Sequence, residues 1–156
     1  MTLLFPFLLI WQAVGAPPAK VTASVRRIFG AEATTSPLAA GTDTVLRVAR
    51  ADTLLGFALV RAVKGKDQPI TFLVAIDTAD RLKDIDILVY REPYGGEVAY
   101  DAWRRQFRGK SSDAALQVGR DIRTISGATI SVNAVTLGVR KALHDLTDWH
   151  HSGALK

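Results

Sequence analysis

The chain has 156 residues, of which 48% are hydrophobic and 22% charged, and it contains no cysteine. This length and composition predict one folded domain with a buried core. The absence of cysteine excludes disulfides, Cys-ligated zinc, iron–sulfur clusters and CxxCH haem attachment. The formal net charge of +5 is spread along the chain, so it favours anionic ligands and does not indicate a nucleic-acid partner.

The first segment of the chain has the pattern of a targeting signal. Residues 3–14 form an apolar run without a charge, and small residues and prolines follow at 15–19. The run is shorter than the roughly 20 apolar residues of a transmembrane helix. We therefore predict a secretory signal peptide over residues 1–19, cleaved near Ala16 or Ala19. A short membrane anchor through residues 3–16 and a buried helix are the alternatives. A signal peptide or an anchor implies an exported, periplasmic or other extracytoplasmic domain.

Apolar periodicity predicts the next elements in chain order. Helical spacing indicates a helix over residues 19–29 that ends at Gly30. The segment 31–42 is rich in Ala, Thr, Ser, Pro and Gly, and is expected to be irregular. Four β-rich runs follow, and the short polar breaks between them favour hairpins of an antiparallel meander. The runs cover residues 45–50, 55–64, 69–77 and 82–91.

The second half of the chain is predicted to be mainly helical. In the last β-rich run, Asp84 and Asp86 alternate with apolar residues and are expected to face water. Short helices are predicted at 102–107 and 112–119, and a long amphipathic helix at 131–149. The fold class is α+β, with an antiparallel β-meander packed against N-terminal and C-terminal helices. The domain is expected to span residues 20–150, with a tail at 151–156.

The segment before the last helix carries the candidate chemistry. A helix N-terminus exposes unpaired N–H groups and the positive end of the helix dipole, so it favours a phosphate group. Gly127 and Ala128 let a ligand approach the backbone closely, and Arg123 adds positive charge nearby. Hydroxyl side chains surround these two small residues. They belong to Ser126, Thr129 and Ser131. On the residues alone, simple N-capping by Thr129 or Ser131 is the alternative and needs no ligand.

The sequence from Ser126 to Ser131, Ser-Gly-Ala-Thr-Ile-Ser, resembles the flavinylation motif of the FMN-binding domain family. That family includes the C and G subunits of sodium-pumping and Rnf-type electron-transfer complexes, and also stand-alone exported proteins. Residues 90–97, followed by Trp103 and Phe107, resemble the second signature of the family. The form of this signature, with Glu-Pro-Tyr-Gly-Gly at 92–96, is closer to the stand-alone members.

The resemblance implies that Thr129 carries FMN through a phosphoester bond, attached by a dedicated flavin transferase that uses FAD and a divalent metal. It also implies an electron carrier, between a membrane redox partner and an extracytoplasmic acceptor, rather than an enzyme with its own substrate turnover. Two alternatives remain. One is non-covalent FMN binding with a flavin reductase-like activity, and the other is a flavin-free sensor or interaction domain.

Aromatic residues and glycines of the second signature are further candidates for the cofactor site. Tyr90, Tyr94 and Trp103 either stack on the flavin ring or fill the core. Gly95 and Gly96 form a turn, contact the cofactor, or do both.

Charged residues in the same region also have two interpretations each. Glu92 and Glu97 either hydrogen-bond the flavin or are solvated. The basic run over residues 104–110 is predicted to be a solvated face, with partner docking or phosphate pairing as the alternative. The three histidines of the chain lie at or beyond the end of the last predicted helix. They lack an acidic partner at metal-ligand spacing, so we predict no metal site and expect exposed or frayed side chains.

Overall fold

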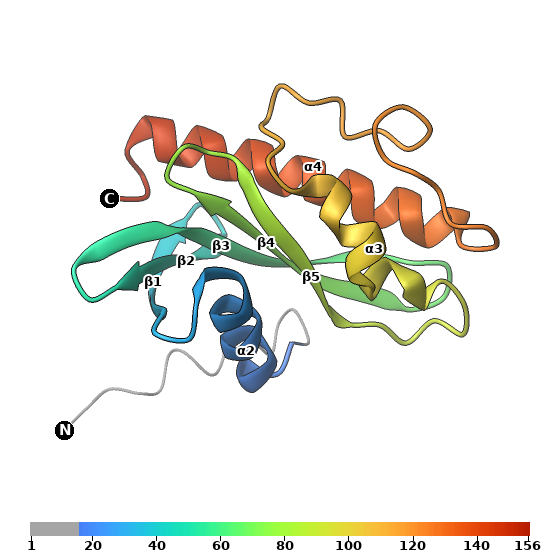
Figure 1. Cartoon of the computed structure of the whole chain (residues 1–156), viewed down its shortest axis with the longest axis horizontal. Coiled ribbons are helices and arrows are strands. Elements are labelled where there is room, and N and C mark those ends of the chain that lie inside the picture. Colours follow the sequence, from blue (N-terminus) through green and yellow to red (C-terminus); the bar gives the residue numbers. More distant parts are fainter. Residues whose placement is uncertain (1–15) are drawn as a thin grey trace.

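The computed structural model describes residues 16–156, so most of the predicted leader lies outside the described residues. A first helix, α2 (Pro18–Phe29), precedes five strands, and a long helix, α4 (Thr129–Ser152), follows them (Figure 1). The strands are β1 (Thr34–Ala40), β2 (Asp43–Arg50), β3 (Thr53–Lys64), β4 (Pro69–Asp77) and β5 (Leu82–Val89). Between β5 and α4 lie the short helices η1 (Gly96–Ala99), α3 (Asp101–Arg104) and η2 (Arg105–Phe107). In the described part of the chain, no helix is long and apolar enough to cross a membrane.

The five strands form one antiparallel sheet in the order β1-β2-β3-β4-β5, which confirms the predicted meander and the α+β class. Helix α4 covers one face of the sheet and α2 covers the other, so the core has two parts. Strand β4 contributes to both parts. Its Phe72 and Val74 belong to the α4 side, whereas Leu73 and Ala75 belong to the α2 side. Because side chains alternate along a strand, a strand covered on both faces requires a nearly continuous apolar sequence.

Strand β1 lies in the segment that we expected to be irregular, so that prediction is wrong. All seven of its residues pair with β2, from Thr34 opposite Ala49 to Ala40 opposite Asp43. The strand forms one edge of the sheet and is mostly exposed, and an edge strand tolerates a proline such as Pro37. Pairing with β2 therefore holds β1 in an extended conformation that the local composition did not predict.

The connection between β5 and α4 contains one predicted helix and lacks the other. The predicted helix at 102–107 is confirmed as α3 and η2, with the Trp103 and Phe107 rings in contact. Residues 112–119 form turns instead of the second predicted helix. Leu116 and Gly119 have positive φ angles, of 42° and 84°, and a right-handed helix cannot pass through such residues.

Asp84 of β5 does not face water as expected, and Asp86 does so only in part. Asp84 is 4% exposed, because α2 covers this face of the strand and α3 and η2 lie against its edge. Three arginines hold its carboxylate. Their distances to Asp84 Oδ2 are 2.9 Å from Arg27, 3.3 Å from Arg104 and 3.0 Å from Arg108. Asp84 therefore joins α2, β5 and the segment after β5 through one buried carboxylate.

Helix α4 confirms the predicted C-terminal helix and extends beyond both of its predicted ends. It lies close to the sheet at Gly138, where an added Cβ atom would be 2.6 Å from Val63 and 2.8 Å from Phe72. This close approach fixes the helix across β3 and β4. The first residue of α4 is Thr129, so the packing of the helix also fixes the position of the candidate site.

The far end of α4 is held by the turn between β4 and β5. His150 Nδ1 and His151 Nε2 contact the two carboxylate oxygens of Asp80 at 2.6 and 2.7 Å. The expected fraying is therefore wrong for these two, because the helix continues through them to Ser152. The expected exposure is confirmed for His151, whereas His150 is only partly exposed. Beyond the helix, Leu155 is buried in the core on the α4 side of the sheet.

Candidate functional site

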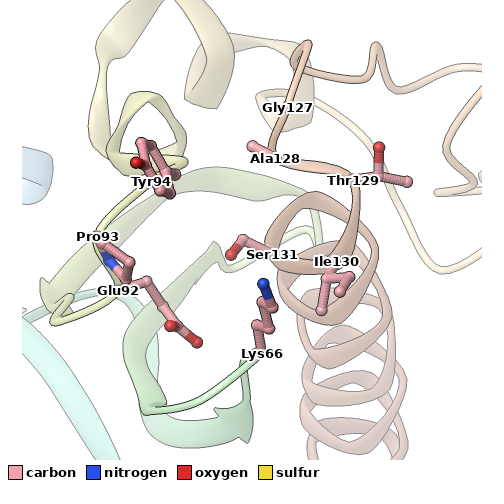
Figure 2. Close-up of a pocket in the computed structure, with 9 residues that line it drawn as sticks. All are labelled: Lys66, Glu92, Pro93, Tyr94, Gly127, Ala128, Thr129, Ile130 and Ser131. Atoms are coloured by element: carbon pink, nitrogen blue, oxygen red, sulfur yellow. The ribbon is translucent and has the colours of Figure 1, made fainter.

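A cavity of about 320 Å³ lies at the N-terminus of α4. Its walls come from three separate parts of the chain: the turn between β3 and β4, the segment after β5, and the first residues of α4 with the turn before them (Figure 2). The lining residues are Lys66, Glu92, Pro93, Tyr94, Gly127, Ala128, Thr129, Ile130 and Ser131. The hydroxyl-rich motif and part of the second signature thus meet at one cavity.

The hydroxyl of Thr129, the first residue of α4, has no structural role. Ala128 occupies the N-cap position, and no side chain caps the helix, so neither Thr129 nor Ser131 performs the capping that we considered as an alternative. Thr129 is exposed and its hydroxyl has no hydrogen-bond partner among the described residues. In Figure 2 this hydroxyl points away from the body of α4. A free hydroxyl beside unpaired N–H groups suits a phosphate ester.

Ser131, in contrast, is part of the wall. It is 5% exposed, and its hydroxyl lies 3.0 Å from the hydroxyl of Tyr90. The Tyr90 hydroxyl also donates a hydrogen bond to the carbonyl oxygen of Tyr94. Tyr90 therefore connects the segment after β5 to the start of α4. The Tyr94 side chain is 79% exposed and remains available to stack on a ligand.

Gly95 brings the segment after β5 against the start of α4. Its φ angle is 86°, and an added Cβ atom would lie 2.6 Å from the Tyr90 hydroxyl and 2.9 Å from Ala128 Cβ. A side chain at this position would push the two walls apart. The position thus requires glycine for both its backbone conformation and its close approach.

We expect the Gly95→Ala substitution to destabilise the protein more than Gly109→Ala. Gly109 has a similar φ angle of 80° but open space where its Cβ atom would lie, so it controls for the backbone term. The left-handed conformation costs about 1–2 kcal/mol in each variant, and overpacking adds about 1–3 kcal/mol at Gly95 alone. Urea unfolding measures the difference. Equal losses in the two variants would show that the contact with Ala128 is unimportant.

Glu92 holds the third wall of the cavity in place. Its Oε1 accepts hydrogen bonds from the backbone N–H groups of Asp67, at 2.8 Å, and Gln68, at 3.0 Å. These bonds, chiefly the one from Gln68, lower the pKa of Glu92 below its usual value, so the side chain is an anion at neutral pH. Lys66 belongs to the same turn, and in Figure 2 its side chain points toward the start of α4.

The structure does not bring every candidate residue to this cavity. Trp103 is 5% exposed in the core, and its indole N–H donates to the Arg123 carbonyl oxygen at 2.9 Å. Arg123 lines a different cavity, of about 590 Å³, together with Arg105 and Arg120. Gly96 begins η1 and is not part of the lining. The exposed residue Ser126 lies in the turn just before the lining residues.

Sequence reasoning alone missed Lys66. It lies 63 residues before Thr129, in a hairpin turn whose composition indicates only a turn. Only the pairing of β3 with β4 and the Glu92 hydrogen bonds place it at the cavity. A lone lysine in a polar turn carries no signal that distinguishes it from a solvated one.

A small α+β domain with a cavity at a helix N-terminus is typical of a domain that holds a cofactor. A model of the FMN-binding domain matches residues 65–144, just over half of the chain, and the chain belongs to this family. The matched region contains every residue that lines the cavity.

A curated relative points to the same family. The chain is 33% identical over 91 residues to the G subunit of the proton-translocating ferredoxin:NAD(+) oxidoreductase complex of Clostridium ljungdahlii. The similarity covers 54% of this chain and 49% of the relative, so the chain spans about half the length of that protein. Membership of the family and this likeness support FMN binding and a role in electron transfer.

The residues of the cavity fit FMN in three respects. The N-terminus of α4 supplies positive potential for the phosphate group. The exposed Tyr94 ring offers an aromatic surface for the isoalloxazine ring. Glu92 Oε2 is buried and has no hydrogen-bond partner among the described residues, so it can accept a hydrogen bond from a ligand.

Proposed function

We propose that this protein is an exported electron-transfer flavoprotein that carries FMN through a phosphoester bond to the Thr129 hydroxyl oxygen. The observation that carries the proposal is the free, exposed Thr129 hydroxyl at the start of α4, inside the region that matches the FMN-binding domain. FMN would supply the redox chemistry, and the protein would supply the tether, the phosphate site and the surroundings of the ring.

The attachment step needs a second protein, a flavin transferase that uses FAD. In this step a bond forms between the Thr129 oxygen and the FMN phosphorus of FAD, and the pyrophosphate bond of FAD breaks. AMP leaves, and the hydroxyl proton passes to a base of the transferase. The contribution of this chain is to present the hydroxyl. Gly127 and Ala128, which have little or no side chain, leave room for the transferase at the turn.

The redox partners follow from the class of the protein rather than from a single contact. The relative of Clostridium ljungdahlii is named as part of a ferredoxin:NAD(+) oxidoreductase complex. By analogy, this chain would exchange electrons with a membrane redox partner and an extracytoplasmic acceptor. A tethered cofactor suits an exported protein, because FMN that dissociates outside the cytoplasm is not readily replaced.

The start of the mature domain is part of the same proposal. Helix α2 begins at Pro18, and Ala16 is 3% exposed in the core beneath it. A cut close to Ala16 would leave α2 whole, whereas a cut after Ala19 would remove its first residues. We therefore favour processing near residue 16, with retention of the segment as a membrane anchor as the alternative.

The decisive experiment is to express the full chain with and without an exported flavin transferase and to record its intact mass and visible spectrum. We expect one FMN group per chain and a yellow protein only when the transferase is present. A yellow protein without added mass would instead indicate non-covalent binding. A colourless protein without added mass, made beside an active transferase, would overturn the flavoprotein proposal.

A further inference from the structure

Glu92 on the cavity wall has one carboxylate oxygen with a hydrogen-bond partner and one without, among the described residues. Glu92 Oε1 accepts the two backbone N–H groups of the β3–β4 turn, and this fixes the direction of the carboxylate. The second oxygen, Oε2, is buried and has no hydrogen-bond partner among the described residues. A buried carboxylate oxygen without a donor is costly, and such atoms normally meet a partner that completes them.

The missing partner has to be a hydrogen-bond donor. An ionised carboxylate accepts hydrogen bonds only, and Glu92 is kept ionised by the backbone groups that bind its other oxygen. Glu92 lines the same cavity as Thr129, where the proposed FMN is tethered. The oxidised isoalloxazine ring has a single N–H group, the imide N–H between its two carbonyl groups. FMN has further donors in the hydroxyls of its ribityl chain. The exposed Tyr94, however, lies two residues after Glu92 on the same wall, so a flavin ring stacked on Tyr94 would bring the imide N–H to the position where the wall lacks a donor.

We propose that Glu92 Oε2 accepts a hydrogen bond from the imide N–H of the flavin ring, and that Glu92 and Lys66 set the reduction potential of the flavin with opposite signs. This inference rests on the proposed binding of FMN in this cavity. In this inference the charges of Glu92 and Lys66 tune the reduction potential. Lys66 was not predicted as a site residue from the sequence.

The sign of each effect follows from electrostatics. Reduction adds electron density to the ring, and a fixed negative charge at hydrogen-bond distance disfavours that change. Glu92 therefore lowers the reduction potential, and its neutralisation raises it. Lys66 lines the same cavity with a positive charge, which favours the reduced ring. Its neutralisation is expected to lower the potential.

Glu97 supplies a matched control. It lies five residues after Glu92 and carries the same charge, but it is exposed on η1 and does not line the cavity. The two glutamates had the same two interpretations on sequence grounds. The structure separates them, because only Glu92 has a buried oxygen that lacks a donor.

The test uses the full chain, loaded with FMN by the transferase, and compares the Glu92→Gln, Lys66→Gln and Glu97→Gln variants. Glutamine keeps an oxygen that can accept the N–H groups of the β3–β4 turn, so the wall should remain in place. Equilibration with redox dyes gives the ratio of reduced to oxidised flavin at a fixed potential. We expect this ratio to rise about tenfold in Glu92→Gln, equivalent to about 30 mV for a two-electron couple. It should fall in Lys66→Gln and stay unchanged in Glu97→Gln.

A second measurement does not depend on any variant. FMN labelled with ¹⁵N at the imide position reports the imide proton by NMR, and a carboxylate acceptor shifts that proton downfield and slows its exchange. Such a signal in the wild-type protein supports the contact even if Glu92→Gln does not fold. A wild-type imide proton that exchanges as in free FMN, or equal potentials in Glu92→Gln and Glu97→Gln, would overturn the inference. A chain that takes up no FMN would refute the proposed function itself, which is a separate outcome.

Discussion

Replacing Thr129 with alanine is expected to abolish covalent flavin completely. The substitution removes the only atom of this residue that can bond to phosphorus, and it leaves the helix intact because Thr129 does not cap α4. Co-expression with the transferase, followed by denaturing electrophoresis, should show flavin fluorescence in the wild-type band and none in Thr129→Ala. The free energy of unfolding should change by less than about 0.5 kcal/mol, as for other exposed positions without a structural role.

Two control variants define what the result means. Thr129→Ser keeps the hydroxyl and should retain part or all of the fluorescence. Ser126→Ala removes the neighbouring exposed hydroxyl and should leave the fluorescence unchanged. Fluorescence that persists in Thr129→Ala and disappears in Ser126→Ala would move the attachment to Ser126. The tether would then lie in the turn before the helix.

The Asp84→Asn substitution should produce a large loss of stability. Asparagine has the same shape but no charge, so three arginines would lose their common partner. Arg104 is the most affected, because its side chain is 9% exposed and cannot turn to water. Removing one partner from a buried ion pair typically costs about 3–5 kcal/mol. Urea unfolding of the two proteins measures this difference.

Asp86→Asn is the matched control on the same strand. Asp86 contacts Arg27 at 3.4 Å and Ser24 at 2.7 Å, but its side chain is 22% exposed and water can replace part of these contacts. We expect a loss of about 1 kcal/mol or less. Equal losses in the two variants would mean that the Asp84 carboxylate is not the central link that its contacts indicate.

The free energy of unfolding should depend on pH through the protonation of the Asp84 carboxylate. Burial alone would raise the pKa of Asp84, but hydrogen bonds from Arg27 and Arg108 outweigh it and hold the pKa below its usual value. A group whose pKa is lower in the folded state stabilises the protein above its unfolded pKa, which is about 3.9 for aspartate. That contribution is lost as the pH falls from about 4 through the folded pKa. The unfolding free energies of wild type and Asp84→Asn should therefore converge in acid.

Local patterns predicted the elements whose apolar residues repeat most regularly. The four strands β2 to β5, α2 and α4 all have such repeats, and their order along the chain fixes a meander. Strand β1 has no such pattern, because an exposed edge strand needs few apolar residues and takes its order from β2. The predicted helix at 112–119 failed because left-handed residues at 116 and 119 interrupt it. Glycine and, less often, Asn or Asp signal that conformation in a sequence, whereas a leucine such as Leu116 does not.

The candidate site was predictable in part for the same reason. The hydroxyl-rich turn and the segment after β5 are compact motifs, and both reach the cavity. Trp103 was expected either to stack on the cofactor or to fill the core, and it fills the core. Arg123 was expected near the cofactor and instead lines a second cavity. Which aromatic or basic side chain faces a ligand depends on how distant segments pack. Lys66 shows the same limit, since its role depends on strand pairing alone.

The place of Thr129 at the end of a long helix has a consequence for the proposed flavoprotein, because it determines where the flavin would exchange electrons. Helix α4 has 24 residues and is about 36 Å long, and its first turn lies at one end of the long axis of the molecule in Figure 1. A flavin held there occupies the tip of an elongated body, where a partner can reach it through a small area of contact. Small contact areas give short-lived complexes, as in other electron-transfer encounters. The shape therefore suits a shuttle that visits donor and acceptor in turn, touching each with the same end.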